Sequence, residues 1–498
     1  MTDRDGVPPP ADTRLLTGIP GLDMLLSGGL PANRLHLIEG DPGTGKTTLA
    51  LQFLLEGRAK GESCLYVTLS ETANELRGIA ASHGWSLDGI NVLELARAEG
   101  SAEQYTLYHP SEIELGDMVR SVLDATDRLR PTRVVLDSLS EMRLLAREPL
   151  RYRRQILSLK EYFSTRDTTV LLLDDRTSGE HDLQLQSLAH GVVRLEQTPF
   201  DYGRARRRMR IIKIRGVAAT EGFHDFKIAR GGLVVYPQLV PRTEGARVPT
   251  AMRSGIAELD SLLGGGVSRG TCTLFLGPAG VGKSTVAAQY AMMPDVPAAA
   301  FLFDERRATF VDRCHALGMK VKDRLASGGL RIEQIEPGEL SPGEFAHRVR
   351  DCVDRENCRV VLIDSLNGYL NAIPSGHSPL VRMHELIAYL NERNVVTLLI
   401  MAQHGMMGTQ MPVPLDVSYL ADAVVMLRYF EADGMVRKAI SVVKKRTGSH
   451  ETSIREFVVG PGGVRLGEPL TQFQGVMSGV PTYRGNLPLM RNDGTNRG

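Results

Sequence analysis

The chain has 498 residues, which is too long for one ordinary domain and predicts two or three. Hydrophobic residues make up 42% and charged residues 23%, and the net charge of only +1 argues against a general attraction to nucleic acid or anionic lipid. No apolar run exceeds strand length and the five cysteines form no close pair, so we expect a cytoplasmic protein with reduced thiols and without signal peptide, membrane span, disulfide or zinc site.

Short β-branched runs alternate with longer helical patterns along the chain. In the first half we expect buried strands at 35–40, 64–69, 133–137 and 168–174, and a helix at 49–61. In the second half we expect strands at 273–277, 299–304, 359–364 and 395–401, and a helix at 285–293. This alternation predicts parallel α/β domains.

The chain contains an internal duplication. TGIPGLDMLLSGGLPANRLHLIEGDPGTGKTT at 17–48 is matched by SGIAELDSLLGGGVSRGTCTLFLGPAGVGKST at 254–285, with a constant offset (254 − 17 = 283 − 46 = 237). A repeat of this length indicates two homologous domains and not a solenoid. The predicted organisation is a first domain at 12–240, a linker at 241–250, a second domain at 251–480 and a flexible tail at 481–498.

Both copies contain a glycine-rich loop that fits G-x-x-x-x-G-K-[ST] between a predicted strand and a predicted helix. Glycines let the backbone curl so that its N–H groups point at phosphate oxygens, and the following helix adds its positive end. The pattern predicts ATP binding, with Lys46 and Lys283 reaching the β- and γ-phosphates. The expected ATP-binding residues are Gly40, Asp41, Pro42, Gly43, Thr44, Gly45, Lys46, Thr47 and Thr48, and Gly277, Pro278, Ala279, Gly280, Val281, Gly282, Lys283, Ser284 and Thr285.

A magnesium ion is expected beside each loop. The hydroxyls of Thr47 and Ser284 are the loop ligands that the pattern predicts. Asp137 and Asp364 each end an apolar strand downstream of a loop, where the second carboxylate of such a site is needed. A lone aspartate at a strand end is more often a cap or turn residue, but its occurrence in both copies favours the metal site.

ATP hydrolysis also needs a group that orients and deprotonates the attacking water or hydroxyl. Glu71 follows the second strand of the first copy, and Asp304 and Glu305 follow the matching strand of the second. The carboxyl ends of parallel strands face the ligand crevice, which favours a catalytic role for these three residues. The alternative is that they cap the next helix.

These features together resemble the KaiC family, a branch of the RecA-like ATPases with two tandem P-loop NTPase domains and mostly parallel central sheets. The resemblance extends from about Leu15 to Tyr483 and includes ASHGW at 81–85 and a late KxR motif in each copy. It implies that Lys213 and Arg215, and likewise Lys444 and Arg446, reach the ATP of a neighbouring subunit in a closed homo-hexamer. Such a trans-acting cation can accelerate phosphoryl transfer ~10³-fold or more.

The sequence departs from the clock members of the family at two places. Those members carry two adjacent glutamates after the second strand of each domain, whereas the first position here holds Ser70 in the first domain and Asp304 in the second. Their neighbouring serine and threonine phosphoacceptors correspond to Ser418 and Tyr419, at a predicted strand start. We therefore expect a KaiC homologue outside the clock, with ATPase activity and a serine/threonine autokinase activity in the second domain, for which Ser418 is the only candidate acceptor.

Two other functions compete with this prediction. The basic run at 204–216 is typical of a DNA-linked ATPase of the RecA or RadA type, although a subunit-interface hairpin explains it without nucleic acid. Ser70 suggests a nucleotide-gated signalling scaffold with little turnover. Gln403 and His404 follow a predicted strand, where they are either sensors of the γ-phosphate or an ordinary loop start. The sequence identifies no protein partner.

Overall fold

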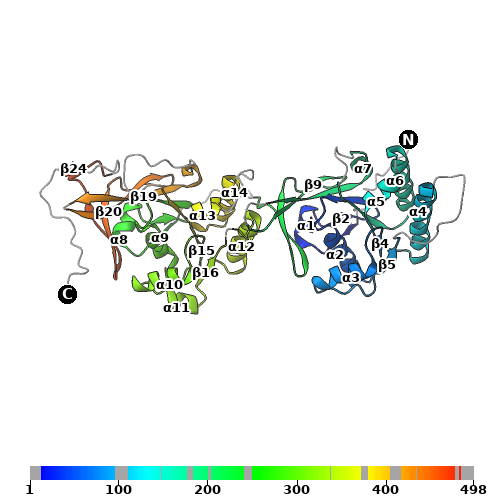
Figure 1. Cartoon of the computed structure of the whole chain (residues 1–498). Coiled ribbons are helices and arrows are strands. Elements are labelled where there is room, and N and C mark those ends of the chain that lie inside the picture. Colours follow the sequence, from blue (N-terminus) through cyan, green and yellow to red (C-terminus); the bar gives the residue numbers. More distant parts are fainter. Residues whose placement is uncertain are drawn as a thin grey trace, which may run out of the picture. The chain divides into compact units, whose positions relative to one another are not determined.

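A computed structural model describes residues 13–95, 110–146, 148–176, 183–199, 203–240, 250–336, 338–371, 379–403, 417–432, 434–476 and 482–483. The chain divides into two compact units, Met1–Gln238 and Leu239–Gly498 (Figure 1). The predicted linker and tail lie almost wholly outside the described residues. Within the described residues, no helix has both the length and the apolar character that crossing a membrane requires.

The first unit is built on one nine-stranded sheet. Neighbouring strands are parallel from β8 to β5, and β9, β10 and β11 extend the sheet in antiparallel fashion. In sheet order the strands are β11 (Gly232–Tyr236), β10 (His224–Ala229), β9 (Arg206–Ile214), β8 (Gly191–Thr198), β3 (Leu35–Gly40), β7 (Thr169–Asp174), β6 (Arg133–Asp137), β4 (Cys64–Thr68) and β5 (Asn91–Glu94). The other elements are β1 (Arg14–Leu15), α1 (Pro20–Leu25), β2 (Leu30–Pro31), α2 (Lys46–Ala59), α3 (Ala73–Ser82), α4 (Pro110–Leu129), α5 (Leu139–Ala146), α6 (Pro149–Ser164) and α7 (Leu183–Leu188).

The second unit repeats this architecture with a second nine-stranded sheet. Its strands, in sheet order, are β16 (Leu330–Gln334), β15 (Ala298–Leu302), β17 (Val360–Asp364), β18 (Val396–Ala402), β14 (Cys272–Gly277), β19 (Ala423–Ala432), β20 (Met435–Lys445), β21 (Arg455–Gly460) and β22 (Gly463–Pro469). The other elements are β12 (Ala251–Met252), α8 (Ala257–Leu262), β13 (Val267–Ser268), α9 (Lys283–Ala291), α10 (Arg307–Ala316), α11 (Val321–Ala326), α12 (Pro342–Arg355), α13 (Leu366–Asn371), α14 (Pro379–Glu392), the 3-10 turn η1 (Ser418–Leu420), β23 (Phe473–Gln474) and β24 (Thr482–Tyr483).

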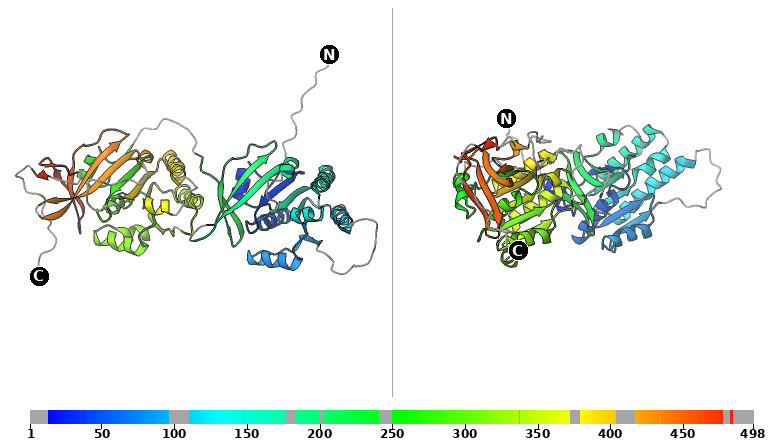
Figure 2. Two further views of the ribbon diagram at one scale, coloured as in Figure 1. Left: turned by 45° about the horizontal axis from the view of Figure 1, so that its top comes forward. Right: turned by 60° about the vertical axis from the view of Figure 1, so that its left-hand side comes forward.

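Helices cover both faces of each sheet (Figure 2). Alternate residues of a strand therefore enter different cores, as with Ile38 in one apolar cluster of the first unit and Leu37 in the other. This two-sided burial explains why the parallel strands are almost continuously apolar in sequence. The prediction of two tandem RecA-like α/β domains with mostly parallel sheets is confirmed.

The predicted strand start at Ser418 is wrong. Ser418 and Tyr419 lie in η1, and β19 begins only at Ala423. The corresponding segment of the first domain forms the helix α7 before β8. The apolar pattern of VSYLADAVV fits a short helical turn followed by a strand as well as it fits one longer strand. In either case Leu420 and the valines that follow it are buried, so the pattern does not show where the strand begins.

Candidate active site

The two glycine-rich loops have the same backbone geometry. Each leaves the carboxyl end of a central strand, β3 or β14, and leads into a helix that starts at the lysine. The N-cap residues Gly45 (φ 103°) and Gly282 (φ 117°) are left-handed, a conformation that other residues adopt at a cost. Neither N-cap offers a side chain to the helix, so the first N–H groups remain available to an anion.

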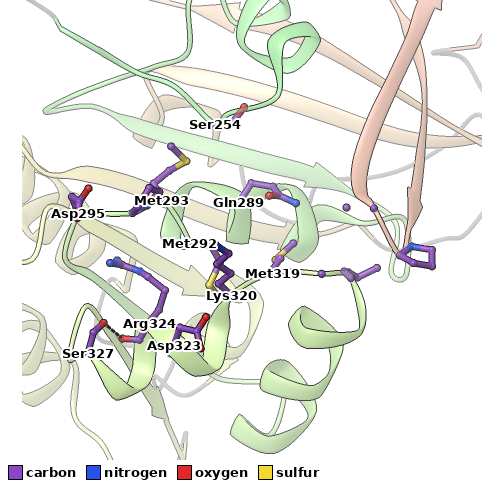
Figure 3. A pocket seen from close by; sticks show the side chains of 16 residues that line it. Ser254, Gln289, Met292, Met293, Asp295, Met319, Lys320, Asp323, Arg324 and Ser327 are labelled. Carbon is purple, nitrogen blue, oxygen red and sulfur yellow. Dashed lines mark hydrogen bonds between the residues drawn. The ribbon is translucent and has the colours of Figure 1, made fainter.

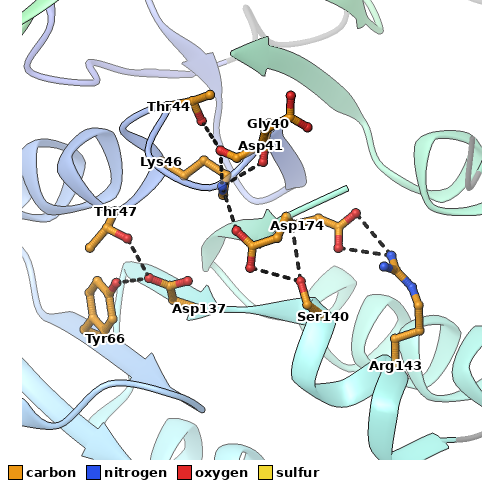
Figure 4. Close-up of polar contacts among 11 residues, drawn as sticks. Gly40, Asp41, Thr44, Lys46, Thr47, Tyr66, Asp137, Ser140, Arg143 and Asp174 are labelled. Carbon is orange, nitrogen blue, oxygen red and sulfur yellow. Dashed lines mark hydrogen bonds and ion pairs between the residues drawn. The ribbon is translucent and has the colours of Figure 1, made fainter. Parts of the chain in front are cut away.

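In the first domain, Lys46 lies at the centre of a polar network (Figure 4). Its Nζ donates to the carbonyl oxygens of Gly40 (2.7 Å) and Asp41 (3.1 Å). The same Nζ forms an ion pair with Asp175 at 2.7 Å. The lysine side chain thus already lies over the loop that is expected to hold phosphate.

Lys283 has a different environment in the second domain. Its Nζ donates to the carbonyl oxygen of Pro278 at 2.6 Å. Among the residues that the structure describes in this domain, no carboxylate forms an ion pair with it. Burial therefore lowers the pKa of Lys283 to about 8, although the nearby Asp364 opposes the shift.

The loop hydroxyls contact the strand-end aspartates in both domains. Thr47 donates to Oδ2 of Asp137 at 3.1 Å, and the hydroxyl of Tyr66 donates to the same oxygen at 2.5 Å (Figure 4). Ser284 lies beside Asp364 in the second domain, and its hydroxyl favours the charged form of that carboxyl and so acts to lower its pKa. Burial raises the pKa of both aspartates.

These hydroxyl–carboxylate pairs fit Mg²⁺. Oδ2 of Asp364 is buried without a hydrogen-bond partner among the described residues, which is costly for a carboxylate unless a cation satisfies it. The oxygens of Thr47 and Asp137 form the same hard-ligand set in the first domain, and Mg²⁺ prefers such oxygens together with phosphate.

Glu71 is not a helix cap. The N-cap of α3 is Thr72, which forms a capping box with Glu75. The backbone of Glu71 is held by Thr68, whose Oγ1 donates to its carbonyl oxygen at 2.7 Å and accepts from its N–H at 3.0 Å. One carboxylate oxygen, Oε2, is buried without a partner among the described residues. Burial raises the pKa of Glu71, and the charge of Asp137 adds to the shift.

Glu305 occupies the equivalent position but is paired. Arg313 donates to its two carboxylate oxygens from Nη2 (2.7 Å) and Nε (3.1 Å), and from Nη1 to Thr285 of the P-loop helix (3.2 Å). Arg313 is the seventh residue of α10, and Ile79 stands at the seventh position of α3. The first domain therefore has no arginine at the position from which Arg313 holds Glu305.

Asp304, the other predicted base, lies two residues beyond the end of β15 and accepts a hydrogen bond from Ser365. The helix α10 is capped by Arg306 without a side-chain bond, so neither carboxylate acts as the cap.

In each domain, the KxR motif and the P-loop lie at opposite ends of the strands of the central sheet. Lys213 pairs with Val192 near the start of β8, and Lys444 pairs with Val424 near the start of β19. These strand starts adjoin the first residues of β3 and β14, whereas the P-loops leave the far ends of the same strands. A strand of six residues spans ~20 Å, so these cations are remote from the phosphate loop of their own domain.

The KxR residues contact the segments that precede β8 and β19. Arg215 donates to the carbonyl oxygen of Ser187 at 2.9 Å. Lys444 donates to the carbonyl oxygens of Ser418 (2.7 Å) and Ala421 (2.9 Å), and Arg446 lies 3.6 Å from Asp422.

The candidate phosphoacceptor region is accessible. Ser418 is exposed, and Tyr419 is 45% exposed with its ring 6.5 Å from that of His384. Gln403 is buried at the end of β18, and its Oε1 has no partner among the described residues. His404 lies outside the described residues.

The second domain contains a cavity of about 630 Å³. It lies at the C-terminal end of α9, away from Lys283, and is lined by Gln289, Met292, Met293 and Met319 among others (Figure 3). In the first domain a Cβ on Gly232 would lie 2.6 Å from the Trp85 indole, whereas the nearest atom at the equivalent Gly463 is 3.5 Å away. The cavity occupies the space left because α9 is shorter than α2 and because Met319 stands where the first domain has Trp85.

Sequence reasoning missed three side chains of the two sites, namely Tyr66, Asp175 and Arg313. When the two copies are aligned, Asp175 stands opposite Ala402 and Arg313 stands opposite Ile79. That comparison marks these positions as differences between the domains, but it gives no indication of their contacts. Tyr66 carried no signal, because a tyrosine within a buried strand is ordinary.

The fold, the duplicated P-loops and the paired aspartates define a tandem P-loop ATPase. The family model for the KaiC ATPase matches residues 15–240 and again 252–471. The chain therefore belongs to the KaiC family.

Curated relatives match almost the whole chain, two circadian clock proteins among them. It is 26% identical over 494 residues to the circadian clock protein KaiC3 of Synechocystis sp., covering 97% of both chains. It is 24% identical over 484 residues to the circadian clock oscillator protein KaiC of Synechococcus elongatus, covering 95% of this chain and 92% of the relative.

Proposed function

We propose that this chain binds and hydrolyses Mg·ATP at both P-loops, each located at an interface between subunits of a homo-hexameric ring, and acts as a regulatory ATPase. The observation that carries the proposal is the repeated arrangement of a left-handed glycine N-cap, a buried lysine and a hydroxyl–aspartate pair. When bound, Mg²⁺ would neutralise the negative charge that develops during phosphoryl transfer. Thr47 with Asp137, and Ser284 with Asp364, would hold it.

The first domain is proposed to carry most of the turnover. Glu71 has a buried, unpartnered carboxylate oxygen and a raised pKa, which suit a general base. Glu305 must first leave Arg313 before it can accept a proton. From the sequence, Ser70 led us to expect slower ATP hydrolysis in the first domain than in the second, and the proposed order of the two rates is the opposite.

Steady-state ATPase assays of Glu71→Gln and Glu305→Gln test this proposal. We expect Glu71→Gln to lower the rate of the first site ~100-fold, and with it most of the total rate, and Glu305→Gln to change the total rate little. Unchanged turnover in both variants would instead support the nucleotide-gated scaffold.

The position of the KxR motifs supports assembly in a ring. Each pair lies at the far end of its sheet from the P-loop of its own domain, and we propose that it serves a P-loop of another subunit. Sizing with and without Mg·ATP checks this, and we expect a hexamer with nucleotide.

DNA binding is less well supported. Glu196 accepts from Arg208 at 3.0 Å and lies 3.7 Å from Arg210, and both guanidinium groups stack on Phe223. The basic run thus has partners within its own domain. Filter binding at low salt tests the alternative, and steeply salt-dependent retention of DNA would favour it.

Autokinase activity is proposed only for the second domain, with Ser418 as acceptor. Ser418 is exposed beside Lys444, which we propose as one of the cations that act on a neighbouring subunit. Intact-mass measurement after incubation with Mg·ATP should show a gain of one phosphate that Ser418→Ala abolishes. An unchanged phosphorylated mass in Ser418→Ala would exclude this acceptor.

A further inference from the structure

Asp175 holds the P-loop lysine of the first domain in a charged contact that no described carboxylate of the second domain makes with Lys283. The Lys46 Nζ lies 2.7 Å from Oδ1 of Asp175, and the two side chains are only 7% and 27% exposed. Ser140 fixes the carboxylate, because its Oγ donates to Oδ2 at 3.1 Å and accepts from the Asp175 N–H at 3.2 Å. Burial alone would raise the pKa of Asp175, but the hydrogen bond and charge of Lys46 outweigh it and lower this pKa.

The second domain has alanine at the equivalent position. In the first sheet Asp174 pairs with Glu39, which places Asp175 beside Gly40 at the start of the P-loop. In the second sheet Ala402 pairs with Gly277, the residue equivalent to Gly40. A methyl group therefore stands where the first domain has a carboxylate, and Lys283 contacts only the loop backbone among its described neighbours.

We propose that Asp175 competes with the phosphates of ATP for Lys46, and that the first P-loop is thereby a weaker and faster-exchanging nucleotide site than the second. The inference rests on the proposed function, because it assumes that both loops bind ATP.

The competition is direct because both ligands of the lysine are anionic oxygens. To reach the β- and γ-phosphates, Lys46 must leave Asp175. The carboxylate stays in place through Ser140 and becomes an unpaired negative charge beside the nucleotide. Asp137 and Glu71 already lie near enough for their charges to couple with that of Asp175. A hydrogen bond to a charged group corresponds to roughly 10- to 100-fold in a binding constant, which sets the scale of the effect.

The test measures binding of the fluorescent analogue N-methylanthraniloyl-ATP with Mg²⁺ to full-length chains that keep one functional P-loop. In chains carrying Lys283→Ala, the fluorescence change reports binding at the first site alone. We expect Asp175→Asn, which keeps the shape and removes the charge, to lower the dissociation constant ~10-fold and to slow release of the analogue.

The reciprocal change provides the matched control. In chains carrying Lys46→Ala, Ala402→Asp should weaken binding at the second site ~10-fold, whereas Ala402→Asn, of equal size but uncharged, should not. Thermal melting of each variant confirms that it is folded.

The outcomes separate the inference from the function on which it rests. If the Lys283→Ala chain binds the analogue and Asp175→Asn binds it equally or more weakly, the competition is refuted while ATP binding stands. If the Lys283→Ala chain fails to bind at all although folded, ATP binding at the first site is refuted and the inference falls with it.

Discussion

Glu71 and Glu305 occupy the same position in the two domains but have different electrostatic surroundings. Burial and Asp137 raise the pKa of Glu71 above its ordinary value of 4.5. A base acts only when ionised, so the rate should fall as the pH falls through this raised pKa. In a Lys283→Ala chain, we expect the pH–rate profile to have an acid limb centred above pH 4.5.

Measuring kcat between about pH 5 and pH 8 checks this expectation. Glu71→Gln should abolish the limb together with most of the activity. A limb that survives at the same pH in Glu71→Gln would belong to another group.

Arg313 restrains Glu305 in the second domain. It holds both oxygens of Glu305, and the first domain has Ile79 in its place. Arg313→Ile should free the carboxylate and raise second-site ATPase activity, measured in a Lys46→Ala chain, by roughly 10-fold. Arg313→Lys, which retains a cation without bidentate geometry, should give a smaller increase. A decrease in both variants would mean that Arg313 supports catalysis.

Among the elements, the central strands β3 and β8 carry a buried ion pair that their counterparts do not. Glu39 and Arg194 are 4% and 9% exposed, and Nη2 of Arg194 lies 2.5 Å from Oε1 of Glu39. Gln186 also donates to Glu39 at 3.0 Å. At the same register the second domain pairs Leu276 with Met426.

This difference predicts an asymmetric mutational response. Arg194→Met should lower the free energy of unfolding by ~3–5 kcal/mol, because it leaves Glu39 buried without its main partner. Glu39→Leu together with Arg194→Met should recover most of that loss, since the second domain packs the same apolar pair. Urea denaturation of the full chain measures both, and a double variant as unstable as the single one would contradict the prediction.

Elements and sites were predictable to different degrees. The buried strands and P-loop helices could be predicted because parallel strands covered on both faces are continuously apolar, and because glycine spacing sets the loop geometry. The turn at Ser418 could not, since a short turn before a strand buries the same side chains as the strand would. The pairs Lys46–Asp175 and Glu305–Arg313 also could not, because each depends on tertiary contacts between different elements.

For the whole molecule, the decisive feature is that each KxR pair and the P-loop of its own domain lie at opposite ends of one sheet. A head-to-tail contact between identical subunits would bring the cations of one chain toward the P-loop of the next, and such a contact must close into a ring or form a filament. Arg215 and Lys444 already contact backbone carbonyl groups in their own chain, so these two side chains have a defined orientation within a single subunit.

Mixed rings test this directly. One chain carries Lys46→Ala and a second carries Lys213→Ala with Arg215→Ala, both with Lys283→Ala to silence the second domain. Each chain alone should be inactive, because either the P-loop or its trans-acting cations are missing at every interface. Random mixing in equal amounts should restore about a quarter of the first-site ATPase rate, since that share of interfaces joins an intact P-loop to intact cations. If the cations instead acted within their own chain, no mixture would regain activity, and sizing of the mixtures would show whether the rings had formed.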